Sequence, residues 1–144
     1  TPHTNFIVLG GPKEDTKPLL RMYQSILGPG AVYREVSAAT AELMKYTINT
    51  FLATKVAFFN EIYDIAGLAG VDYDELRELV LLDERVLPNH TMVTQERGFG
   101  GKCLPKDLSA LIFRARELGY EPVLLAAVWA SNEKVRALAR KQRA

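Results

Sequence analysis

The chain's one cysteine lies in a glycine-rich stretch, GFGGKCLPKD, which covers residues 98–107. Glycines let a backbone approach a ligand closely, and Pro105 suits the first turn of a helix. Cys103 would then lie at the start of that helix, where the helix dipole and nearby Lys102 and Lys106 favour the nucleophilic thiolate. Free cysteines are commonly buried and inert. The stretch alone therefore leaves a reactive and a structural thiol about equally open.

Two further polar side chains, Lys45 and Asn49, lie four residues apart in a long apolar segment. On a helix this spacing puts both on one face, where a lysine and an amide can contact the same ligand. A solvated helix face is the more common explanation, but apolar neighbours weaken it here. Asp107 follows Cys103 by one helical turn. We expect the two pairs to converge on one cleft, with the sulfur and the carboxylate within roughly 8 Å of the lysine amine.

Arg85 lies in the segment LLDERV, just ahead of the glycine-rich region. A guanidinium at this place can bind a phosphate. A surface ion pair with Asp83 or Glu84 is the more common outcome. Both interpretations remain open from the sequence.

The N-terminal part of the chain has the pattern of a short β/α unit followed by a long helix. The run FIVLGG at 6–11 predicts a buried strand, 18–27 predicts a helix, and AVYREV at 31–36 predicts a second strand. Ser37 can cap a helix that continues to the 67–70 region, about 30 residues and ~45 Å long. Its apolar residues lie on more than one side, so part of it should pack on something outside this chain.

The rest of the chain predicts three shorter helices and one long loop. Asp72 and Glu75 form a capping-box-like start for a helix that ends at Leu82. Residues 83–104 lose periodicity and gain glycine and proline, which is typical of an ordered functional loop. Pro105 and Pro122 each suit the first turn of a following helix, the first of which ends near Gly119.

Composition excludes several classes of protein. Lys and Arg number 18 against 17 Asp and Glu, and only the tail from 136 to 143 is basic, so no nucleic-acid partner is expected. No run of about 18 apolar residues could cross a membrane, and the opening TPHTN lacks a secretory signal, so we expect a cytoplasmic protein without a membrane partner. His3 and His90 form no metal-ligand cluster with Cys103.

Taken in order, four segments resemble the UDP-glucose/GDP-mannose dehydrogenase family: AELMKYTINTFLATKVAFFNEI, LLDERV, GFGGKCLPKD and AVWASNEKVR. The resemblance implies a mainly α fold. Residues 37–144 would form the family's central helical domain, which dimerises through the long helix at 37–67. Residues 1–36 would be a short β/α remnant, the end of a Rossmann-like NAD-binding domain.

The resemblance also implies an activity. The family oxidises a UDP- or GDP-hexose, with UDP-glucose the first candidate here, to the uronic acid, using two NAD molecules in succession. Cys103 matches the nucleophile that forms a thiohemiacetal and then a thioester. Lys45 matches the lysine that stabilises negative charge on the sugar oxygen, and Asp107 matches the carboxylate that works with it on the catalytic water.

Other residues acquire binding roles by the same resemblance. Asn49 would orient the reacting oxygen, and Arg85 would reach the substrate of a neighbouring subunit. Residues 94–100 match the sugar-nucleotide loop, which adds Thr94, Phe99 and Gly100 to the substrate-binding residues. Cys103 and Lys106 would lie beside the cofactor. Lys102 departs from the small residue that is often found there.

Two rival interpretations stay open. The sequence has no GxGxxG fingerprint and no upstream acidic block. We therefore expect a piece of the enzyme that is inactive when isolated, and a truncated dimerisation module without catalysis is the alternative. A related dehydrogenase of the hydroxyacid or 6-phosphogluconate type would use a lysine on a long helix without a cysteine, and the GFGGKCLPKD block disfavours it.

Overall fold

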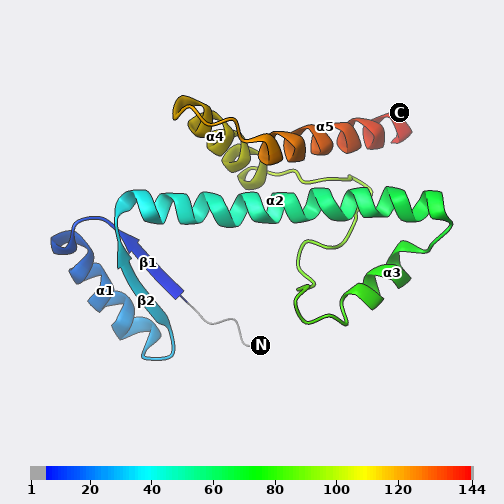
Figure 1. Cartoon of the computed structure of the whole chain (residues 1–144). Helices are drawn as coiled ribbons and strands as arrows, with labels where there is room; N and C mark the ends of the chain where they lie inside the picture. The colour runs from blue at the N-terminus through cyan, green and yellow to red at the C-terminus, as the bar shows by residue number, and fades with distance from the viewer. Residues whose placement is uncertain (1–5, 144) are drawn as a thin grey trace. The chain divides into compact units, whose positions relative to one another are not determined.

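A computed structural model describes residues 6–143 as two strands and five helices (Figure 1). The opening TPHTN with His3, and Ala144, lie outside the described residues. The chain divides into two compact units, of which one ends at Thr47 and the other begins at Ile48. This division falls within a helix, whereas the sequence places a domain boundary at 36/37, and that assignment stays a prediction. None of the described helices is long and apolar enough to cross a membrane.

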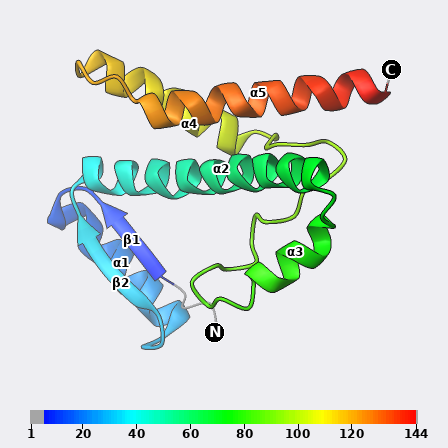
Figure 2. The ribbon, with the colours of Figure 1, turned by 45° about the vertical axis from the view of Figure 1, so that its right-hand side comes forward.

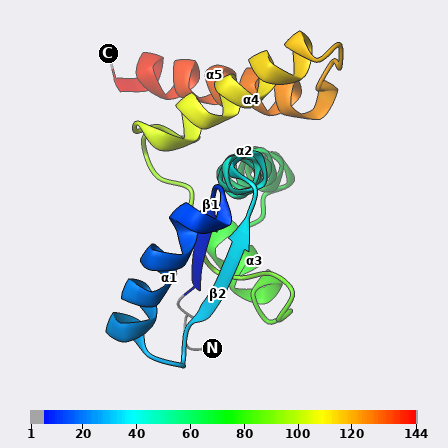
Figure 3. The ribbon, with the colours of Figure 1, turned by 90° about the vertical axis from the view of Figure 1, so that its left-hand side faces the viewer.

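The first unit is built on a parallel strand pair. Strand β1 (Phe6–Gly10) and strand β2 (Val32–Val36) are joined by helix α1 (Lys13–Leu27), which packs beside both strands (Figure 3). The predicted strand, helix and strand are thus confirmed, although the first strand is not buried as expected, because Phe6 is 55% exposed and no residue of β1 belongs to the buried core. The helix begins five residues earlier than expected and contains Pro18 in its interior. Its first turn carries two acidic residues, which the helix dipole favours at an N-terminus.

Helix α2 (Ala38–Ala69) begins in the first unit and continues through the second. Its start is capped as predicted, because the Ser37 hydroxyl accepts a hydrogen bond from the Thr40 amide at 3.1 Å. It has 32 residues and is followed by Gly70 at φ 72, a left-handed conformation that glycine adopts readily at a helix end. The predicted length of about 30 residues is confirmed.

The second unit adds three helices to the later part of α2. They are α3 (Tyr73–Val80), α4 (Cys103–Glu117) and α5 (Val123–Arg143). The Asp72 side chain caps α3 by accepting from the Glu75 amide, although this helix ends two residues before the expected Leu82. Helices α4 and α5 lie side by side along one side of α2, and α3 lies on the other (Figures 1 and 2).

The second unit has two apolar clusters. The larger joins α2, α4, α5 and the loop before α4, and its buried members are Ala53, Val56, Ala57, Phe99, Leu108, Ile112 and Val128. The smaller joins α2 to α3 through Phe59, Ala66 and Tyr73. Residues 81–102, all within the described part of the chain, form a long loop without helix or strand, two residues earlier at each end than the expected 83–104. This loop therefore connects the two sides of α2.

Candidate active site

Cys103 is the first residue of α4 and its side chain is exposed. Pro105 occupies the third position of the helix, where its missing amide hydrogen costs no helical hydrogen bond. The expected location at a helix N-terminus is confirmed. Within the described residues Cys103 is exposed and not part of the core, and its reactivity stays a prediction.

Asp107 lies one turn further along α4 and is completely buried. A buried carboxylate loses hydration, and donors must compensate for that loss. The Asn49 side-chain nitrogen on α2 donates to Asp107 Oδ2 at 2.5 Å, and the Lys106 amine lies 3.4 Å from Oδ1. The structure thus brings together two predicted site residues that lie 58 positions apart in the sequence.

Lys45 lies on α2 one turn before Asn49, within the same continuous helix. The residue is exposed, and its amine lies 5.5 Å from the centre of the Tyr46 ring. This geometry is that of a cation–π contact. The expected approach of the Lys45 amine to Cys103 and Asp107 stays a prediction.

The turn ahead of Cys103 is held by two buried asparagines. Asn60 Oδ1 on α2 accepts from the Gly98 amide at 2.9 Å, and Asn132 Oδ1 on α5 accepts from the Phe99 amide at 2.7 Å. The Phe99 side chain is 3% exposed and belongs to the larger apolar cluster. Phe99 therefore fixes the loop from its inner side, and the substrate contact assigned to it from the sequence stays a prediction.

The glycines of this turn are required by close contacts within the chain itself. Gly98 has φ 62, and a Cβ there would lie 2.3 Å from Asn132 Oδ1. A Cβ at Gly100 would lie 2.8 Å from the Arg136 guanidinium, which ends a flexible side chain and can move. Glycine is therefore most strictly required at 98. The structure shows that these glycines admit Asn132 and Arg136, and the room for a ligand that the sequence suggested stays a prediction.

The remaining predicted binding residues lie further along the loop. Thr94 is exposed, and its carbonyl accepts from the Arg97 amide at 2.9 Å to close a turn. The Arg85 guanidinium pairs with Asp83 at 2.6 and 2.9 Å, which is the surface ion pair that the sequence left open. These hydrogen bonds hold the pKa of Asp83 below its usual range and raise the pKa of Arg85. Arg85 is therefore paired with its own acidic neighbour, and its substrate contact stays a prediction.

Asn60 and Asn132 were missed by the site prediction from sequence. Each is almost fully buried, at 1% and 2% exposure. Asn60 also accepts from Arg97 Nε at 3.0 Å and donates to the Val56 carbonyl at 2.9 Å. An asparagine inside an apolar helical run must find partners when it is buried, and this was the available signal.

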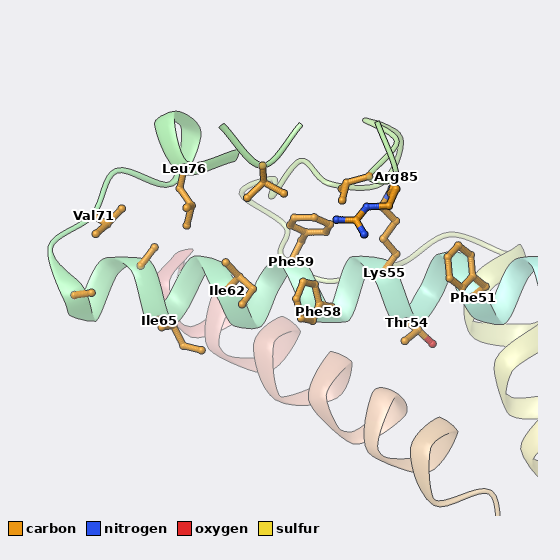
Figure 4. A pocket seen from close by; sticks show the side chains of 14 residues that line it. Phe51, Thr54, Lys55, Phe58, Phe59, Ile62, Ile65, Val71, Leu76 and Arg85 are labelled. Atoms are coloured by element: carbon orange, nitrogen blue, oxygen red, sulfur yellow. The ribbon is translucent and has the colours of Figure 1, made fainter. Parts of the chain in front are cut away.

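An apolar groove of about 880 Å³ lies on the other side of α2, against α3 (Figure 4). Phe59 and Ile62 project from α2 into it, and Leu76 faces them from α3 (Figure 4). Arg85 and Lys55 lie close together between Phe59 and Phe51 (Figure 4). The Lys55 amine donates to the Leu87 carbonyl, and loss of hydration lowers the pKa of Lys55.

Among residues 6–143 no group of histidine, cysteine and acidic side chains could hold a metal ion.

Comparisons with known proteins point to one family. Residues 39–134 match the model of the UDP-glucose/GDP-mannose dehydrogenase family, central domain. A GDP-mannose 6-dehydrogenase of Azotobacter vinelandii is 41% identical over 109 residues, which cover 71% of this chain and 25% of that protein. A UDP-glucose 6-dehydrogenase of Pseudomonas aeruginosa is 38% identical over 121 residues, covering 84% of this chain and 25% of that protein.

A solved structure agrees with these relatives. The UDP-glucose dehydrogenase of the hyperthermophilic archaeon Pyrobaculum islandicum matches with a TM-score of 0.80 at 36% identity, over 90% of this chain and 29% of that one. The chain spans about a quarter of the length of the curated relatives named above.

Proposed function

The chain belongs to the UDP-glucose/GDP-mannose dehydrogenase family, and from this premise we propose that it forms the central, cysteine-bearing part of a nucleotide-sugar 6-dehydrogenase. The observation that carries the proposal is the start of α4, where an exposed Cys103 lies one turn before a buried Asp107 held by Asn49. The relatives named above act on UDP-glucose or GDP-mannose. We assign this chain a UDP- or GDP-hexose, with UDP-glucose first.

The proposed reaction takes carbon 6 of the sugar from the alcohol to the acid through two hydride losses. NAD, when bound, accepts each hydride. After the first oxidation the Cys103 thiolate adds to the aldehyde carbon, and the resulting alkoxide takes up a proton to give a thiohemiacetal. Loss of that proton and of the second hydride leaves a thioester. Water then attacks its carbonyl, the carbon–sulfur bond breaks, and the acid and the thiolate are released.

Lys45, Asn49 and Asp107 would support this chemistry from α2 and α4. The Lys45 ammonium would stabilise negative charge on the sugar oxygen and exchange a proton with it. Asn49 fixes the Asp107 carboxylate one turn from the sulfur, where it can orient the hydrolytic water. Thr94, Gly100 and the backbone between them would bind the sugar nucleotide, and Arg85 would serve a neighbouring subunit.

The described residues include side chains that would contact a nicotinamide ring, but they do not include a binding site for a whole dinucleotide. Cys103 is exposed, and so is the Lys106 side chain at 67% in the same helical turn. Gly10, the last residue of β1, packs closely against α2 within residues 6–47, because a Cβ there would lie 2.5 Å from that of Ala41. No GxGxxG fingerprint follows β1 in the sequence. The dinucleotide would therefore be held mainly by protein outside residues 6–143, and this chain alone should produce no NADH.

We also propose that the chain forms a homodimer through α2. The supporting observation is the groove described above, together with exposed apolar side chains on the same helix. Phe51 is 65% exposed, Phe58 55% and Leu68 91%. Contiguous apolar surface of this kind marks an interaction site. A dimerising module without catalysis would use the same surface, and this is the second candidate function.

A chimaera tests the enzymatic proposal. Residues 39–134 replace the matching segment of the Pseudomonas aeruginosa UDP-glucose 6-dehydrogenase, and UDP-glucose and GDP-mannose are each supplied with NAD. We expect two NADH for each uronic acid, and Cys103→Ser should lower the rate by roughly 10³-fold because an alkoxide forms and leaves less readily than a thiolate.

Two outcomes would contradict the proposal. One is a folded chimaera that binds NAD and oxidises neither nucleotide sugar, which would favour the dimerising module. The other is near-normal uronic acid formation by the Cys103→Ser chimaera, which would remove the nucleophile.

A further inference from the structure

Two consecutive backbone amides ahead of Cys103 are bound by side chains of two different helices. The Gly98 amide donates to Asn60 of α2, and the Phe99 amide donates to Asn132 of α5. Both asparagines are almost completely buried. We propose that Asn60 and Asn132 are positioning residues, which fix the 97–101 turn and through it the presentation of Cys103. The consequence for catalysis rests on the proposed function, whereas the positioning itself does not.

The backbone of this turn explains why outside acceptors are needed. Arg97 has φ 54, Gly98 has φ 62 and Gly101 has φ 74. Residues in the left-handed backbone conformation interrupt the regular hydrogen bonding of a helix or strand. Buried amides at such residues therefore need other acceptors. An arginine rarely adopts the left-handed backbone conformation. The turn therefore depends on contacts from the surrounding helices.

Asn60 anchors the first part of the turn to α2. Its side-chain oxygen receives both the Gly98 amide and Arg97 Nε, while its nitrogen donates to the Val56 carbonyl. Arg97 also reaches Asp64 at 2.7 Å and lies 4.7 Å from the centre of the Tyr63 ring. One buried amide thus orients both the backbone and the side chain of the turn.

Asn132 anchors the next amide to α5 and is coupled to Gly98. A Cβ at Gly98 would lie 2.3 Å from Asn132 Oδ1, so the amide oxygen occupies the space that the glycine leaves. Phe99 lies four residues before Cys103, with its side chain in the core. Loss of the Asn132 acceptor should therefore loosen the segment that leads directly into α4.

The test uses the 144-residue chain and its Asn60→Leu, Asn132→Leu and Asn132→Asp variants. Leucine removes the acceptor at similar size, whereas aspartate keeps an acceptor oxygen in the same place. Tyr73→Phe is the matched control, because it removes a buried side-chain hydrogen bond to the Thr91 carbonyl in the same long loop. The readouts are amide hydrogen exchange at Gly98 and Phe99, the iodoacetamide alkylation rate of Cys103, and thermal unfolding.

We expect roughly tenfold faster amide exchange at Gly98 in Asn60→Leu and at Phe99 in Asn132→Leu, the size expected for one lost hydrogen bond. The Cys103 alkylation rate should change about threefold or more in both variants and return toward the wild-type value in Asn132→Asp. Tyr73→Phe should alter neither readout at a similar loss of thermal stability. Unchanged exchange at Gly98 and Phe99, or an equal alkylation change in Tyr73→Phe, would overturn the proposal.

The wild-type chain provides a second test that does not depend on any variant folding. Scalar coupling through the hydrogen bond between the Phe99 nitrogen and the Asn132 side-chain carbonyl carbon should be detectable by NMR, and its absence would contradict the assignment. In the chimaera, Asn132→Leu should lower kcat more than it raises the KM for UDP-glucose. An inactive chimaera with positive NMR and alkylation results would contradict the proposed function and leave the positioning role of Asn60 and Asn132 intact.

Discussion

The two sides of α2 in the second unit differ in how completely the chain itself covers them. On the side of α4 and α5, polar side chains of α2 have partners within the chain, because Asn49 donates to the buried Asp107 carboxylate and Asn60 accepts from the Gly98 amide. On the side of α3, an apolar groove remains open and phenylalanines of α2 are exposed. A built polar site and an uncovered apolar face thus share one helix. The polar site is held by hydrogen bonds within the chain, whereas the apolar face is left open by the described residues and fits the proposed dimer contact.

The largest effect is expected on the side of α2 that carries the apolar groove. Phe58→Asp places a charge on the proposed dimer surface, and it should weaken self-association by about 100-fold, which is the effect typical of a central interface residue. Phe113→Asp is the control, because Phe113 is 65% exposed on α4 and lies outside the groove. Sedimentation equilibrium of the two variants would measure the difference. A wild-type chain that stays monomeric at high micromolar concentration would contradict the dimer.

The next largest effect is expected on the side of α2 that faces α4 and α5. Asn49→Leu removes a donor to the buried Asp107 carboxylate and should lower the free energy of unfolding by about 2 kcal/mol. Thr54→Val is the comparison on the groove side, since the Thr54 hydroxyl only donates within α2 to the Thr50 carbonyl. That change should cost less than about 0.5 kcal/mol. Equal losses in the free energy of unfolding, measured by urea denaturation, would contradict the proposed difference between the two sides of α2.

The smallest effect is a pH dependence on the α3 side. Burial raises the pKa of Tyr73, whose hydroxyl donates to the Thr91 carbonyl at 2.6 Å. Because the folded-state pKa lies above the unfolded value, this contribution to stability is full below about pH 10 and is lost as the pH rises through the folded-state pKa. Thermal unfolding at pH 9 and 11 should show a larger loss for the wild type than for Tyr73→Phe. Identical losses would show that Tyr73 does not contribute.

Sequence reasoning located the elements that depend on local chemistry. Ser37 and Asp72 were identified as caps because a cap needs only its own next turn. The meeting of Asn49 with Asp107 was predicted because each lies on a defined face of a helix and the family resemblance implied one shared site. The resemblance to a family supplied the roles that spacing alone left open for Cys103.

Other features could not be predicted because they depend on tertiary contacts. Asn60 and Asn132 bind backbone amides of a loop, and nothing in the sequence fixes where those amides point. The early start of α1 contradicted the expectation that Pro18 begins it, since the acidic first turn stabilises the helix before the proline. The pairing of Arg85 with Asp83 was one of two alternatives, because the sequence does not fix the conformation of an exposed side chain, and the substrate contact of Arg85 stays a prediction.

The most direct test of the central claim is to trap the acyl group on Cys103. The chimaera is mixed with UDP-glucose and NAD, quenched in acid within one turnover and digested, and the Cys103 peptide is weighed by mass spectrometry. We predict the added mass of a UDP-glucuronosyl thioester on that peptide, and more of it in Asp107→Asn because hydrolysis would slow. Uronic acid formation at the full rate with no adduct on Cys103 at any time would contradict the account.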